Sequence, residues 1–188
     1  MRPQDFINQW NAPGFDESSR LNVYSALSLQ TLPIPPESLE FLTLAGLPDS
    51  AAPFLSFGAS HTHTLPSVAD TWSQPPDFDR FRIIGSNSSG DPICIDLLTN
   101  AAVVYLNHDD AFDRIFMNTS VDRLAECLLA FRELVNQTNA RNGAEAYLSG
   151  NVPKDILQRC IHRLTSTAPS AMAPGCSWRD EIQGLTMQ

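Results

Sequence analysis

The sequence predicts an α+β protein with a mainly antiparallel central sheet, flanked by N-terminal and C-terminal helices. Between residues 81 and 117, short apolar runs alternate with turns rich in glycine, asparagine and aspartate. After Ser120, and again after Pro153, apolar residues instead recur every three or four positions, as in amphipathic helices. The chain of 188 residues is long enough for one buried core and shows no internal repeat. We therefore expect a single domain over residues 1–188.

Two short helices are expected in the N-terminal part of the chain. Residues 3–10 place Phe6, Ile7 and Trp10 on one side of a helix. Residues 36–45 begin with Pro36 and are followed by Gly46, which suits the position just after a helix end. The small, polar and proline-rich composition of residues 59–79 predicts a long loop.

A strand meander is expected next. Segments 81–84, 93–95 and 101–106 predict three antiparallel strands, and 114–117 a fourth short one. Gly85 and Gly90 bracket the first turn, where we expect them to supply dihedral angles that other residues resist.

The C-terminal part predicts further helices. Ser120 caps a helix of about 17 residues, judged from its three-and-four apolar spacing. Pro153 opens the next helix in its first turn, residues 165–176 form a linker, and residues 177–182 form a last helical turn capped by Ser177.

The charge balance limits the classes of partner. There are 12 Lys and Arg against 21 Asp and Glu, a formal net charge of −9, so we expect no direct nucleic-acid partner. No apolar stretch is long enough to span a bilayer and the N-terminal residues do not resemble a signal peptide, so we expect a cytoplasmic protein without a membrane partner. The four cysteines form no C-x-x-C pair, which favours reduced and mostly buried thiols.

Residues capable of catalysis or metal binding are sparse. Acids gather at 77–79 and at 108–110, where a histidine joins them, but both groups lie where solvated loops are ordinary. Gly85 and Gly90 have the spacing of a phosphate loop but are followed by Asp91 rather than by lysine. We expect no catalytic residue, no metal and no cofactor. A metal-dependent hydrolase remains the weaker alternative, with these candidate ligands: His108, Asp109 and Asp110, joined by His61 or His63.

Negative charge is concentrated in one part of the predicted sheet. Between Ile83 and Asp113 there are five aspartates and no Lys or Arg, which predicts a negative field able to steer a cationic partner. A merely solvated acidic rim is the alternative. The residues that we expect to contribute to partner binding are Asp91, Asp96, Asp109 and Asp110.

Several motifs of the chain resemble those of the SUKH superfamily. The predicted helix over 36–45 is followed by Gly46-Leu47-Pro48, as in the family. Residues 81–96 have its strand–glycine–turn–strand pattern, and Trp178 followed by Glu181-Ile182 is similar to its C-terminal motif. Segments 54–57, 104–109 and 116–120 are also similar to the family pattern. The resemblance extends over residues 38–182, is best over 81–135, and looks closest to the subgroup with the Gly-Leu-Pro motif.

The resemblance implies a SUKH-like fold and a function. Bacterial members are mostly immunity proteins without enzymatic activity, which neutralise a cognate polymorphic toxin, such as a nuclease or a deaminase, by occluding its surface. Such toxins tend to present cationic surfaces, which an acidic inhibitor would attract. A regulatory or scaffold module of the same superfamily is the alternative. The sequence leaves open the identity of the toxin, the interface and the oligomeric state.

Overall fold

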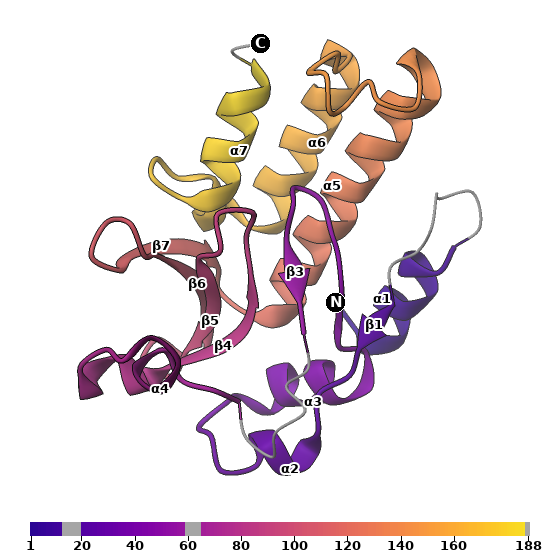
Figure 1. Cartoon of the computed structure of the whole chain (residues 1–188). Coiled ribbons are helices and arrows are strands. Elements are labelled where there is room, and N and C mark those ends of the chain that lie inside the picture. The colour runs from indigo at the N-terminus through magenta and orange to yellow at the C-terminus, as the bar shows by residue number, and fades with distance from the viewer. Residues whose placement is uncertain (13–19, 59–64, 187–188) are drawn as a thin grey trace.

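A five-stranded antiparallel sheet forms the centre of the protein (Figure 1). The computed structural model describes residues 1–12, 20–58 and 65–186. The strands follow one another in chain order across the sheet, so each pairs with its neighbour in sequence. They are β3 (Ser56–Phe57), β4 (Phe81–Ser86), β5 (Pro92–Asp96), β6 (Ala102–Asn107) and β7 (Asp113–Asn118). The predicted meander is confirmed, and β3 adds a strand that the sequence did not predict.

Tight turns connect the last three strands. The turn between β5 and β6 has positive φ at Asn100 (54°) and Ala101 (59°), and the one between β6 and β7 at Ala111 (49°) and Phe112 (61°). Paired positive φ angles match the right-handed twist of a hairpin, although glycine and asparagine usually occupy these positions. Ala111 and Phe112 are therefore held in a conformation that side chains disfavour.

Helices cover one face of the sheet and share its main core (Figure 1). These helices are α1 (Pro3–Trp10), α3 (Pro36–Leu44), α5 (Val121–Asn142) and α7 (Ser177–Thr186), with α6 (Lys154–Thr167) packed against α5. The core joins Phe6 of α1, Phe131 of α5 and Trp178 of α7 to Ile93 and Met117 of the sheet. This shared core supports one domain over residues 1–188, which stays a prediction.

A smaller layer covers the opposite face of the sheet. The helix α4 (Val68–Trp72) and the 3₁₀ helix η1 (Pro76–Arg80) lie beside β4. Their side chains join a second apolar cluster with Phe81, Cys94 and Val104. The prediction of a long loop over 59–79 is wrong for residues 68–72 and 76–79, which are helical, and its first part, 59–64, lies outside the described residues. The Ser67 hydroxyl accepts a hydrogen bond from the Asp70 backbone amide at 3.1 Å and so caps α4. The proline-rich composition of the segment gave no indication of this helix.

The Gly-Leu-Pro segment ends α3 and begins a small second sheet. β1 (Leu21–Asn22) pairs with β2 (Leu47–Pro48), and α2 (Ala26–Leu29) lies between β1 and α3 in the chain. Gly46 has a φ of 69°, and a Cβ there would lie 2.0 Å from the carbonyl oxygen of Asn22. A side chain at this position would therefore push β1 away.

Gly85 has a different role from the one expected. It lies within β4 rather than in the turn, and a Cβ would come within 2.2 Å of the Ser56 carbonyl oxygen. The missing side chain allows the backbone of β3 to approach, which places β3 at the edge of the sheet. Gly90, with a φ of 84°, does lie in the predicted turn.

The boundaries of the C-terminal helices differ from the predicted ones. α5 extends over 22 residues rather than about 17, because Thr138 in its polar end is still buried. Pro153 is the residue before α6 rather than inside it. The expected linker contains the end of α6 and the 3₁₀ helix η2 (Pro169–Met172). Ser177, expected to be a cap, is the first residue of α7, which continues to Thr186.

The cysteines are free thiols, as predicted. Cys94, Cys127 and Cys160 are buried and Cys176 is partly so. Burial raises the pKa of Cys127 to about 11 and that of Cys160 to about 12, which keeps both thiols protonated at neutral pH. In the described parts of the chain, no helix has the length and apolar character needed to cross a membrane.

Candidate binding surface

Asp96, one of the four predicted binding residues, is a structural group. Its side chain is fully buried at the end of β5. One carboxylate oxygen accepts Arg114 Nε of β7 at 3.0 Å and Arg80 Nη2 of η1 at 3.3 Å. The other oxygen accepts the Leu98 backbone amide at 3.2 Å. Asp96 therefore links η1, β5 and β7 and is not available to a partner.

Asp91 is also buried and fully engaged. It is 5% exposed and accepts Asn87 Nδ2 at 2.8 Å. It further contacts the backbone amide and Nδ1 of His108 at 3.0 and 2.6 Å. Burial by itself would raise the pKa of Asp91, but the hydrogen bonds from Asn87 and His108 outweigh it and lower the pKa. Asp91 thus joins the β4–β5 turn to the loop after β6.

These contacts narrow the predicted acidic surface. The window from Ile83 to Asp113 contains no cation, but Arg80 and Arg114 lie just outside it and both reach Asp96. An antiparallel meander brings the two ends of such a window together, which charge counting along the chain does not detect. Only Asp109 and Asp110 remain as predicted binding residues with accessible side chains.

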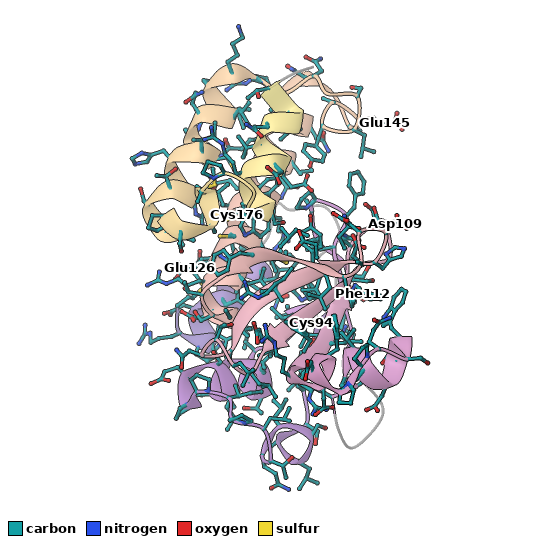
Figure 2. All side chains as sticks on the ribbon, turned by 90° about the vertical axis from the view of Figure 1, so that its left-hand side faces the viewer. Cys94, Asp109, Phe112, Glu126, Glu145 and Cys176 are labelled. Atoms are coloured by element: carbon teal, nitrogen blue, oxygen red, sulfur yellow. The ribbon has the colours of Figure 1, made fainter. Side chains whose placement is uncertain are left out.

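Asp109 and Asp110 lie in the loop between β6 and β7. The side chain of Asp109 is 85% exposed, and Asp110 and Asp113 are also exposed. Figure 2 shows Asp109 and Phe112 at the same edge of the molecule. Phe112 has a positive φ, so this edge carries exposed negative charge beside a strained backbone, and strained backbone is often found at functional sites.

Aromatic side chains border these acids. Phe112 meets Trp72 of α4 edge-on, with ring centroids 5.4 Å apart, and meets Phe78 of η1 at 5.8 Å. Trp72 also lies 5.3 Å from the ring of His108 and is 36% exposed. We call Trp72, Asp109, Asp110 and Phe112 the acidic–aromatic surface. Sequence reasoning missed its aromatic part, because Trp72 and Phe112 lie 40 positions apart and share no motif.

The described residues do not support the alternative prediction of a metal site built on His108, Asp109 and Asp110. His108 faces Asp91 and lies 3.4 Å from Asp109, and among the described residues no three His, Cys, Asp or Glu side chains are placed to hold a metal ion. Asp79 of the second acidic group pairs with Arg82 at 2.7 Å. His61 and His63 lie outside the described residues.

The lowered pKa of Asp91 predicts a pH-dependent contribution to stability. Its pKa is lower in the folded than in the unfolded chain, where about 3.9 is usual, so its stabilisation is present above that value and is lost as pH falls through the folded pKa. Urea unfolding of the wild type and Asp91→Asn should differ most near neutral pH and converge below about pH 4. Asp109→Asn changes an exposed side chain and serves as the control, and its free energy of unfolding should follow that of the wild type at each pH. A constant difference for Asp91→Asn would contradict this assignment.

The fold and this surface define the class of the protein. It is a small α+β protein with a meander sheet, a helical layer on one face, and exposed acidic side chains on a hairpin loop beside the rings of Phe112 and Trp72.

The SUKH-4 immunity protein family model matches residues 4–183, nearly the whole chain, and the chain belongs to this family. The predicted resemblance to the SUKH superfamily is thereby confirmed, while the assignment to the subgroup with the Gly-Leu-Pro motif stays a prediction. No curated protein and no solved structure matches the chain.

Proposed function

We propose that this protein is a cytoplasmic, non-enzymatic immunity protein that binds a cognate bacterial toxin and occludes its active or substrate-binding surface. The observation that carries the proposal is membership of the SUKH-4 immunity protein family over residues 4–183. The two acids predicted to contribute to binding with accessible side chains, Asp109 and Asp110, lie in the loop between His108 and Phe112, whose rings both contact Trp72. Aromatic anchors flanked by charge are typical of protein interfaces.

The chemistry of the surface favours a cationic partner. Asp109 and Asp110 make no ion pair with Lys or Arg among the described residues, so their field extends into solvent. A toxin that acts on nucleic acid would present a complementary cationic surface, and its blockage would remove access to the substrate. The proposal requires no direct contact of this chain with nucleic acid or with a membrane.

The direct test is co-expression with the toxin encoded beside the gene. The immunity protein should restore growth of cells that produce the toxin and should form a complex with it that survives size-exclusion chromatography. Growth arrest in the presence of a stably folded immunity protein, with no complex formed, would exclude the immunity role.

Charge on the loop should control the rate of encounter with the toxin. The double variant Asp109→Asn/Asp110→Asn should associate about fivefold more slowly at low salt and show a flatter dependence on ionic strength, because steering acts through long-range charge. Its dissociation rate should change less. The matched control is Glu37→Gln/Glu40→Gln, which removes two exposed charges from α3. Equal association rates for both double variants, measured by stopped flow, would contradict the role of the loop.

A further inference from the structure

A second feature lies on the helical side of the sheet, where α7 crosses β5, β6 and β7. A pocket of about 230 Å³ opens there between the helix and the strands. Apolar side chains form one part of the lining and polar ones another. The lining includes Ile93, Tyr105, Ser177, Asp180, Glu181 and Gly184.

Two hydroxyl groups that line the pocket have no hydrogen-bond partner among the described residues, whereas Asn87 at its border is bonded to Asp91. Ser177 is only 9% exposed, yet its hydroxyl makes no hydrogen bond to any described residue. The hydroxyl of Tyr105 is likewise without a partner in the described ranges. The two hydroxyls are therefore open to the pocket rather than sealed in the core, and each can still donate to and accept from a ligand that enters it.

Negative charge faces the same pocket without a described counter-charge. Neither Asp180 nor Glu181 forms an ion pair with a described residue, and no Lys or Arg lines the pocket. Partial burial, and then the charge of Asp180, raise the pKa of Glu181. Burial first, with acids that include Asp180 and Glu181 adding to it, raises the pKa of Tyr105. A cation placed here would relieve both effects.

An arginine side chain matches all these groups. Its guanidinium can stack on the half-buried ring of Tyr105, and its several N–H donors can reach Ser177 and the carboxylates. A lysine ammonium is a strongly hydrated point charge that neither stacks nor forms paired hydrogen bonds, so it satisfies fewer of them. We propose that this pocket receives an arginine side chain of the toxin.

This inference rests on the proposed function, but it adds a second contact. The pocket lies on the helical face of the sheet, whereas Trp72 and Phe112 belong to the opposite face. Both border the hairpin of β6 and β7, because Tyr105 pairs with Ile115 two residues beyond Asp113. A partner seated over the β6–β7 loop therefore has the pocket on one side and the acidic–aromatic surface on the other.

The pocket can be tested without the toxin. The probe is Nα-acetyl-L-arginine methylamide, titrated into the full chain and followed by backbone amide NMR shifts. We expect saturable, millimolar binding with shifts confined to α7 and the adjoining ends of β5, β6 and β7. The neutral citrulline analogue, which keeps the shape but lacks the charge, should bind at least about tenfold more weakly. Equal responses to both compounds, or no response to either, would overturn the proposal.

Variants of the two acids give the first matched comparison. Asp180→Asn/Glu181→Gln should lose about tenfold or more in affinity for the arginine probe, while Glu40→Gln, an exposed acid on α3, should leave it unchanged. Unchanged affinity in a folded double variant would refute the assignment of the pocket.

Gly184 offers a second, steric comparison. Nothing lies within 4 Å of a Cβ built on it, so Gly184→Leu should fold while filling the mouth of the pocket. Gln183→Leu adds the same side chain at an exposed position of α7 outside the pocket. The toxin should bind Gly184→Leu at least about tenfold more weakly than Gln183→Leu.

The outcomes separate the two proposals. If the wild type binds and neutralises the toxin but Gly184→Leu and the acid variants do so equally well, the arginine pocket is refuted and the immunity function stands. If the wild type does not bind the toxin but takes the arginine probe selectively, the immunity function is refuted and the chemistry of the pocket stands.

Discussion

Replacing Trp178 with alanine is expected to lower the free energy of unfolding by about 4 kcal/mol, as is usual for a large aromatic side chain removed from a well-packed core. Trp178 is fully buried, with its ring centroid 5.1 Å from that of Phe131. Its indole N–H donates to Asn118 Oδ1 at 2.8 Å, which ties α7 to the end of β7. The substitution would leave both a cavity and an amide oxygen without its donor.

Urea unfolding monitored by circular dichroism would measure this effect. Trp178→Phe keeps most of the apolar volume but loses the hydrogen bond, so we expect a smaller loss of about 1–2 kcal/mol. Leu148→Ala, at a position that is 66% exposed, should change stability by less than about 0.5 kcal/mol. A loss below about 1 kcal/mol for Trp178→Ala would show that α7 contributes little to the cooperative core.

Replacing Asp96 with asparagine is expected to lower the free energy of unfolding by about 3 kcal/mol, because it leaves two arginines beside a neutral buried group. The carboxylate is fully buried, whereas Arg80 and Arg114 remain 33% and 32% exposed. Water can therefore solvate the freed guanidinium groups in part, which keeps the expected loss at the lower end for a broken buried pair.

A double-mutant cycle would test the origin of this loss. Asp96→Asn, Arg114→Met and the combined variant should show a coupling of about 1–2 kcal/mol, since their groups form a direct contact at 3.0 Å. Asp109→Asn, which removes an exposed aspartate from the same hairpin region, should have almost no effect on unfolding. Additive effects of Asp96→Asn and Arg114→Met would mean that Asp96 acts through Arg80 and the Leu98 amide instead.

The elements predicted well are those long enough to contain several apolar residues in a row or at a regular spacing. β4 to β7 and α5 meet this condition, because the central strands are buried on both faces and α5 places a row of side chains in the main core. β1, β2 and β3 contain two residues each and have no period to detect. They exist because Gly46 and Gly85 allow other backbone segments to come close, a tertiary relation that is invisible along the chain.

The candidate site was predicted only in part, for a related reason. Counting charge along the sequence found Asp109 and Asp110, which are exposed, together with Asp91 and Asp96, which are not. Burial depends on the partners that the fold supplies, and these come from Arg80, Arg114 and His108. The pocket beneath α7 is formed by residues that lie far apart in the chain, such as Tyr105 and Asp180, which are more than 70 positions apart. No local sequence motif could therefore predict it.

The separation of buried from exposed acids has an evolutionary consequence. Asp91 and Asp96 hold the hairpins together, so changes there would be selected against for loss of folding. Asp109 and Asp110 contribute little to folding, so substitutions there are nearly free to accumulate. Under the proposed immunity function, a lineage that meets a new toxin could therefore change the loop of Asp109 and Asp110 on an unchanged framework, much as an antibody domain varies its loops.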